Sequence, residues 1–253
     1  MLRMRTDASD RPAWRRRPVH SEERSVSSVQ IRSIRIRSNR KGGLARGPAT
    51  VDPPPVSPTT NREHLARLTA LADANAAEAV RVVADLDAAR LLWRPTPDRW
   101  SVADCLEHLI ATGTVYHPRL RAALATAARD AARDDARWAP TWLGRVFLRA
   151  VGPHGRARRA RPPFVPPPGR LDACPRLLVQ QRDLRALIAD AHGTDLRALR
   201  VESPVSRRLT LTLGEAFEML LVHQQRHLAQ AWRVRTSPGF PACRAPTAGR
   251  GAG

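Results

Sequence analysis

Lysine and cysteine are both scarce in this chain of 253 residues. A single lysine, Lys41, accompanies 42 arginines, a bias that genome composition explains more simply than a binding surface does. The three cysteines, Cys105, Cys174 and Cys243, are odd in number, lie far apart and form no CxxC pair. This pattern argues against a disulfide framework and against a cysteine zinc site, so a reducing compartment is the default expectation.

Long apolar runs are also missing. No stretch approaches the roughly 20 apolar residues that a membrane-spanning helix needs, and no signal peptide with an apolar centre opens the chain. Hydrophobic residues nevertheless make up 42% of the sequence, which is enough for a sizeable core. We therefore expect a soluble, cytoplasmic protein with no membrane span.

The charge is strongly positive but unevenly distributed. A formal net charge of +20 and a pI near 11.7 are typical of a nucleic-acid-binding protein. The excess, however, lies in three segments: +8 in residues 1–58, +5 in residues 153–170 and +3 in residues 235–253. The remaining body carries only +4, so we do not expect a nucleic-acid partner except through the basic N-terminal arm.

Residues 1–58 are rich in arginine, serine and proline. Their only hydrophobic alternation, from Val29 to Arg37, is too short and too basic to build a core, so we predict a disordered region. Three other interpretations stay open. The segment could attract nucleic acid or anionic membranes, target the chain to an organelle, or reflect an overextended start of translation.

Residues 213–234 have the clearest helical pattern in the chain. Small and aliphatic residues recur there at three- and four-residue spacing, which places them on one stripe of a helix. The stripe comprises Leu213, Ala216, Leu220, Ala231 and Val234. His223 and His227 lie within it, four residues apart, so both imidazoles are expected to point toward the interior.

The ends of this helix are also marked in the sequence. Thr212 and Glu215 have the spacing of a capping box, in which each side chain bonds to the backbone N–H of the other residue. Arg233 and Arg235 fall in the last turn, where positive charge is favourable, and a Ser-Pro-Gly sequence follows.

The other elements follow from the same patterns. Helices are expected at residues 62–92, 101–128 and 172–191, the last capped by Asp172, with a short helix at 138–151 and an extended piece at 203–213. Residues 152–170 hold six prolines and five arginines and should form a long crossover loop. We predict an all-α four-helix bundle over residues 59–235, with disordered basic tails at 1–58 and 236–253.

His108 adds a third histidine to the pair on the last helix. It lies on a small and apolar face of the second helix, which begins with a good N-cap at Ser101. Three neutral imidazoles from facing helices, with one position left open, are typical of a catalytic divalent-metal site. A chance pairing of core histidines is the alternative. His64, in the first turn of the first helix, is expected to be exposed or to cap that helix.

Two motifs resemble those of a known family. Residues 100–109, WSVADCLEHL, resemble the W-S-x-x-[ED]-x-[LIV]-x-H-L signature of the DinB-like (DinB/YfiT-like) metal-binding four-helix bundles. Residues 223–230, HQQRHLAQ, resemble their H-x-x-x-H-L-x-Q signature. The resemblance spans about residues 62–234, leaves the basic N-terminus and the arginine-rich insert unexplained, and does not imply DNA synthesis.

The resemblance implies a metal and an activity. The ion would be divalent, commonly zinc, nickel, iron or manganese, held by residues matching His108, His223 and His227. Family members of known activity are mostly metal-dependent transferases or isomerases that use a low-molecular-weight thiol. We therefore expect a metal-dependent transferase or hydrolase that acts on a small-molecule substrate with such a thiol or with activated water. The alternative is a non-catalytic, metal-stabilised interaction or stress-response module, and a homodimer is left open.

Four neighbours of the histidines have predicted roles. Gln230 lies three residues after His227 on the same face, where it could bind a cofactor or substrate or could simply complete a bundle layer. Cys105 is expected to be a small buried thiol rather than a fourth ligand. Glu107 and Arg226 are expected to face solvent or a partner helix.

Overall fold

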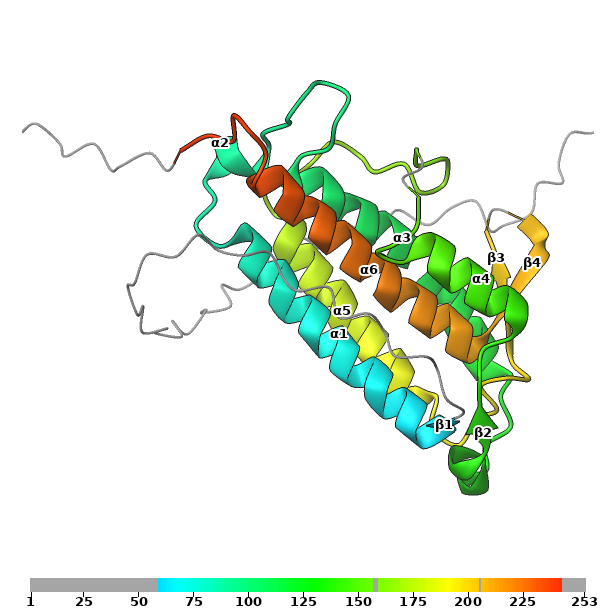
Figure 1. Cartoon of the computed structure of the whole chain (residues 1–253). Coiled ribbons are helices and arrows are strands. Elements are labelled where there is room, and N and C mark those ends of the chain that lie inside the picture. Colours follow the sequence, from blue (N-terminus) through cyan, green and yellow to red (C-terminus); the bar gives the residue numbers. More distant parts are fainter. Residues whose placement is uncertain (1–58, 157–158, 205, 243–253) are drawn as a thin grey trace, which may run out of the picture. The chain divides into compact units, whose positions relative to one another are not determined.

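The computed structural model describes residues 59–156, 159–204 and 206–242 (Figure 1). The predictions for residues 1–58, and for the C-terminal tail from residue 243 onward, lie outside these residues. Within them the chain is mainly helical, which confirms the all-α prediction. No described helix is both long enough and apolar enough to cross a membrane.

Four long helices dominate the described chain and lie side by side in Figure 1. They are α1 (Asn61–Val83), α3 (Val102–Ala125), α5 (Ala173–Asp190) and α6 (Leu213–Arg235). Helices α5 and α6 each pack against both α1 and α3, so every long helix has two long neighbours. This arrangement brings α3 and α6, the helices that carry the three histidines, into direct contact.

Short elements connect the long helices. Three are helical: α2 (Ala88–Leu91), the 3-10 helix η2 (Ala131–Asp135) and α4 (Trp142–Val151). Two small antiparallel sheets pair β1 (Thr59–Thr60) with β2 (Arg137–Trp138) and β3 (Arg200–Ser203) with β4 (Ser206–Thr212). The expected extended piece before the last helix is thus one strand of a hairpin, whose first strand the sequence patterns did not indicate.

Side-chain caps fix where the long helices begin. Complete capping boxes open α1, α3 and α6, formed by Thr60 with Glu63, Ser101 with Asp104, and Thr212 with Glu215. The last two pairs confirm the predicted starts. Asp172 does occupy the N-cap position of α5, but its carboxylate accepts hydrogen bonds from Arg170 at 2.9 and 3.0 Å and caps no backbone N–H.

The prediction of one helix over residues 62–92 is wrong at its C-terminal end. Helix α1 ends at Val83, and Asp85 then adopts a left-handed conformation with φ of 61°, which the short Asp side chain tolerates better than most. Asp87 starts α2 by accepting a hydrogen bond from the N–H of Arg90. The apolar pattern continues through residue 92, but these local backbone preferences break the helix.

Trp138 and His64 also differ from the prediction. The short helix was expected to begin at Trp138, but Trp138 pairs with Thr59 in the first sheet, and α4 begins only after the Thr141 cap. The Trp138 indole is fully buried and stacks on His64, with ring centroids 3.5 Å apart. His64 is therefore neither exposed nor a cap. The stack lies close over Gly214, where a Cβ atom would meet the indole Nε1 at 2.5 Å.

The interior contains two apolar clusters with a polar layer between them. Leu65, Leu184 and Phe217 belong to one cluster, and Leu106, Leu177 and Leu228 belong to the other. Between them, along α1, α5 and α6, lie the buried amides of Asn75, Gln181 and Gln224. Gln181 and Gln224 exchange hydrogen bonds of 2.8 and 2.9 Å, and Asn75 donates to Gln224 Oε1 and to the Leu221 carbonyl. These hydrogen bonds fix how far α1, α5 and α6 are shifted along their axes relative to one another.

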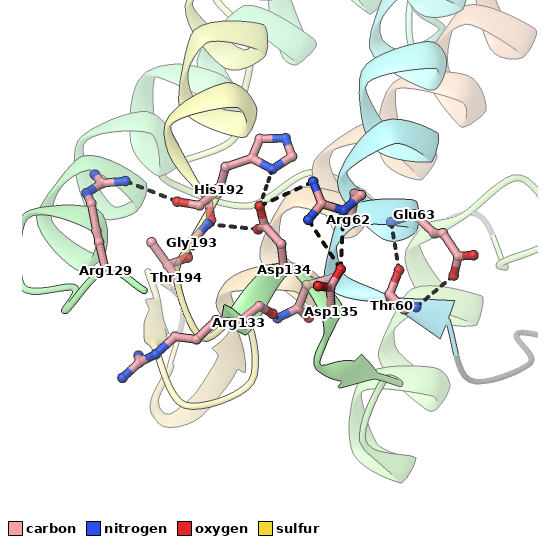
Figure 2. Close-up of polar contacts among 12 residues, drawn as sticks. Thr60, Arg62, Glu63, Arg129, Arg133, Asp134, Asp135, His192, Gly193 and Thr194 are labelled. Atoms are coloured by element: carbon pink, nitrogen blue, oxygen red, sulfur yellow. Dashed lines mark hydrogen bonds and ion pairs between the residues drawn. The ribbon is translucent and has the colours of Figure 1, made fainter. Parts of the chain in front are cut away.

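Asp134 joins three segments at the end of the bundle where α1 begins, as Figure 2 shows. Its carboxylate accepts a 2.8 Å hydrogen bond from the Gly193 N–H and lies 3.1 Å from His192 Nδ1. Arg62 of α1 contacts the same carboxylate at 3.8 Å and Asp135 at 3.2 Å. Burial alone would raise the pKa of Asp134, but these donors and charges lower it.

The first residues of the expected C-terminal tail are packed. Phe240 lies edge-on to Trp93, with ring centroids 5.4 Å apart, and the guanidinium of Arg90 lies over the Phe240 ring. Phe240 therefore packs against the described chain beyond the end of α6, whereas residues 236, 238, 239 and 242 are exposed.

Candidate metal centre

His108, His223 and His227 meet between α3 and α6. One nitrogen from each ring lies within 4.8 Å of the corresponding nitrogens of the other two. His108 and His227 are buried and His223 is half-buried. Because both helices begin at complete capping boxes and pack directly against each other, the two sides of this cluster are held by rigid elements. The structure thus brings together all three histidines singled out in the sequence.

A hydrogen bond orients each imidazole through its Nδ1 atom. His108 Nδ1 lies 2.7 Å from the Phe164 carbonyl oxygen, and His227 Nδ1 lies 3.0 Å from Gln230 Oε1. His223 Nδ1 lies 3.4 Å from the Val151 carbonyl oxygen. An oxygen acceptor at Nδ1 selects the tautomer that carries its proton there, which leaves the lone pair of Nε2 for a metal ion.

Two Nε2 atoms of the cluster lie in close contact. His108 Nε2 and His223 Nε2 lie 3.0 Å apart. With both protons held at Nδ1, this contact would set two lone pairs against each other unless a cation lay between them. Two ligand nitrogens placed tetrahedrally at about 2.0–2.1 Å from zinc are about 3.3 Å apart, so the observed separation fits a shared divalent ion.

Burial keeps the three rings neutral. It lowers the pKa of His108 below the ordinary value of 6.5 and lowers the pKa of His223 to about 3. The pKa of His227 lies well below 6.5 for the same reason, and repulsion from the other two rings lowers it further. Neutral imidazole is the form that coordinates metals, so the ligands need lose no proton near neutral pH.

Trp100 forms part of the surroundings of the cluster. Its ring centroid lies 4.9 Å from that of His108 and 5.6 Å from that of His227. The residue directly precedes the Ser101 cap of α3, so the same capping box that starts the helix also positions the indole. Its place in the WS motif was visible in the sequence, but its contact with two histidines on different helices was not.

The other predicted neighbours separate into distinct roles. Cys105 is fully buried, and burial raises the pKa of its thiol far above the ordinary value, in agreement with a packing residue. Glu107 is also buried and forms a 2.5 Å ion pair with Arg176 of α5, so it faces a partner helix. Arg226 donates hydrogen bonds to the carbonyl oxygens of Gly152 and Arg156, and so holds the start of the loop after α4.

Two of the orienting acceptors carried no sequence signal. The carbonyl oxygens of Phe164 and Val151 are backbone atoms, and any residue type would supply them. Both belong to the stretch from the end of α4 to the start of α5, and Gly169 of the same stretch donates a 3.0 Å hydrogen bond to Asp104 of α3. The proline-rich loop is therefore anchored beside the histidines and contributes to their orientation.

Comparison with known proteins supports one assignment. A family model described as the DinB superfamily matches residues 71–231, a segment that contains all three histidines and Gln230. No curated protein and no solved structure matches the chain significantly. The family model covers more than half of the chain and both histidine motifs, and we conclude that this protein belongs to the DinB superfamily.

Proposed function

We propose that this protein binds a divalent metal ion through His108, His223 and His227. The observation that carries the proposal is the shared orientation of the three rings. Each Nδ1 faces an oxygen acceptor, and a nitrogen of each ring lies close to those of the other two. A set of core histidines without a ligand would gain nothing from bringing unprotonated nitrogens together.

The residues around the site hold the ligands in place. Gln230 accepts from His227 and keeps that ring in the coordinating tautomer, which is a positioning role rather than direct contact with the ion. The Phe164 carbonyl does the same for His108 from the loop before α5. Trp100 lies against two of the rings and limits the access of water from its side.

The reaction that we propose is transfer or hydrolysis of a group on a small molecule. A divalent ion held by three neutral imidazoles with one open position supplies Lewis acidity, which lowers the pKa of a thiol or a water molecule. The protein supplies a site whose ligands are oriented and neutral before any substrate arrives. A low-molecular-weight thiol is the co-substrate that the family resemblance favours, with zinc, nickel, iron and manganese as candidate ions.

One feature of the geometry favours a second, non-catalytic function. The three histidines come from α3 and α6, which also pack against each other, so a bound ion would cross-link two long helices. In that case the ion stabilises a scaffold for interactions or stress response.

Metal analysis tests the first part of the proposal. Purified wild-type protein is expected to retain about one equivalent of a divalent ion, whereas the His223→Ala/His227→Ala double variant should retain almost none. His192→Asn is the matched control, because His192 contacts Asp134 at the far end of α5 and lies outside the cluster. Equal metal content in the wild type and the double variant would refute the site.

A turnover screen then separates the two functions. Metal-loaded protein is mixed with several low-molecular-weight thiols and electrophilic substrates, and thiol consumption is followed. Turnover that the double variant lacks supports an enzyme. A metal-dependent increase in melting temperature without turnover of any pair supports the scaffold.

A further inference from the structure

Helix α4 carries an apolar face that the rest of the described chain does not cover. Its inward residues, including Gly144, Phe147 and Leu148, pack toward α6 and the core. On the opposite side Trp142 is 70% exposed, and Leu143 and Val146 are 42% and 56% exposed. We call these three residues the α4 apolar face. Neighbouring exposed apolar side chains of this kind are typical of a binding surface.

The chain segment around this face is exclusively basic. Residues 136–169 contain seven arginines and no aspartate or glutamate. Arg145 and Arg149 are on α4 itself and both are exposed, as is Arg137 in β2. The exposed apolar residues therefore lie within a long segment of uniform positive charge, and the bound surface should be negatively charged.

The positive charge around the α4 apolar face argues against a second copy of this chain as its binding partner. Face-to-face packing of two α4 helices would bring Arg145 and Arg149 of both copies together with no acidic residue of this segment to offset them. An acidic protein surface would match the charge, but it would also need a groove shaped for a tryptophan. A lipid surface accepts apolar side chains of any shape between its headgroups.

We propose that α4 and its flanking arginines dock this protein onto an anionic lipid bilayer. The arrangement is that of an interfacial amphipathic helix, with tryptophan and aliphatic residues to enter the headgroup region and arginines to contact lipid phosphates. We expect Trp142 to make the main apolar contact with the bilayer, because tryptophan is enriched at the membrane–water interface. The helix lies on the surface and does not span the bilayer.

Helix α4 is already ordered for such a contact. Its start is held by Glu215, whose Oε1 accepts hydrogen bonds from the N–H and hydroxyl of Thr141. Its end is held by Arg226, which donates to the carbonyl oxygens of Ala150 and Gly152. Because both ends are fixed by α6, binding does not require the cost of folding the helix at the membrane.

Vesicle binding by the full-length protein tests the proposal. The wild type is expected to co-sediment with phosphatidylglycerol-containing vesicles and to bind pure phosphatidylcholine vesicles at least about tenfold more weakly. Trp142→Ala/Val146→Ala should reduce binding to the anionic vesicles by about tenfold or more, because it removes most of the apolar contact. Val80→Ala/Val179→Ala is the matched control, since these residues are similarly exposed but lie on α1 and α5.

A charge reversal tests the basic part of the surface. Arg149→Glu should weaken binding to anionic vesicles by about tenfold, whereas Arg182→Glu, an equal change on an exposed position of α5, should not. Circular dichroism of each variant checks that helix content is unchanged, which is expected because all substituted side chains are on the surface.

Fluorescence quenching by lipids tests whether α4 itself enters the bilayer surface, or whether basic residues elsewhere in the chain account for the binding. Lipids brominated near the headgroup should quench wild-type tryptophan fluorescence, and Trp142→Phe should lose most of that quenching. Binding that is unchanged in the Trp142→Ala/Val146→Ala variant, or quenching that persists in Trp142→Phe, would overturn the proposal. So would a lipid-free dimer, detected by sedimentation velocity, that the same double variant abolishes.

Discussion

Glu215 and Thr141 couple the start of α6 to the start of α4. Glu215 Oε1 accepts from the Thr141 N–H at 2.6 Å and from its hydroxyl at 2.7 Å, while Oε2 accepts from the N–H of Thr212 at 2.9 Å. One buried carboxylate thereby serves the caps of two helices, since Thr141 in turn accepts from Gly144. The helix that carries two of the proposed metal ligands and the helix that carries the apolar face share this contact.

Replacement of Glu215 by alanine should therefore be costly. The variant loses a capping box and leaves the half-buried Thr141 groups without their acceptor, so we expect a loss of about 2–4 kcal/mol in the free energy of unfolding. Urea denaturation of the metal-free protein measures it. Glu63→Ala removes the equivalent capping residue of α1 at an exposed position and should cost about 1 kcal/mol or less. Equal losses in the two variants would contradict the double role of Glu215.

Gln230 should control metal affinity through the His227 tautomer. Gln230→Leu removes the acceptor of the His227 Nδ1 proton and should weaken zinc binding by about 10–100-fold, whereas Gln230→Glu keeps an oxygen there and should retain affinity. Competition with a chromophoric chelator measures both dissociation constants. Gln225→Leu makes the same chemical change on another face of α6 and serves as the control. Wild-type zinc affinity in the Gln230→Leu variant would remove Gln230 from the site.

His64 should make the fold sensitive to acid. Burial, aided by the charge of Arg67, lowers the pKa of His64 from 6.5 to about 3 in the folded chain. Between these values the unfolded chain binds more protons than the folded chain, so stability that is fully present above pH 6.5 is lost as the pH falls. The contribution is on the order of 1 kcal/mol per pH unit within this window.

The His64→Asn variant isolates this effect, because asparagine offers Arg67 an acceptor but does not titrate. We expect its free energy of unfolding to depend less steeply on pH than that of the wild type, between roughly pH 4 and 6. Denaturant titrations of the metal-free proteins at several pH values give both slopes. Parallel curves would show that His64 does not titrate in the way its burial predicts.

In the polar layer formed by Asn75, Gln181 and Gln224, the stability effects of replacing Gln181 and Gln224 should be strongly coupled. Gln181→Leu leaves the buried Gln224 Nε2 donor without its acceptor, while Gln224 Oε1 keeps the bond from Asn75, and should cost about 1–3 kcal/mol. The Gln181→Leu/Gln224→Leu double variant should cost clearly less than the sum of the two single changes, because each removes the same pair of bonds. A double-mutant cycle by urea denaturation measures the coupling. Additive losses would mean that the two amides act independently.

The sequence predicted the elements whose signals are local. The capping residues Ser101 and Thr212, together with the three- and four-residue apolar spacing, placed α3 and α6 close to their observed bounds. The same spacing put His223 and His227 on one face. These features depend on residues within a few positions of one another, and helix starts and helix faces are decided at that range. The expected cytoplasmic location and homodimer have no such signal and stay predictions.

The sequence patterns failed where a distant contact or a local turn of the backbone overrides the spacing of the apolar residues. His64 has the position of an ordinary first-turn residue, but the β1–β2 pairing brings Trp138 over its ring and buries both. The apolar run through residue 92 favoured one long helix, yet Asp85 turns left-handed and Asp87 starts a new helix. In both cases packing and capping outweigh the periodicity of the apolar residues.

By itself, the sequence determined where α3 and α6 begin and that His108, His223 and His227 lie on inward faces of these two helices. Only the tertiary structure decided that the rings converge and which tautomer each adopts. The acceptors for His108 and His223 are backbone carbonyl oxygens 56 and 72 residues away in the chain. Such oxygens are present at every residue, so no side-chain pattern can reveal which of them folding brings to a particular imidazole.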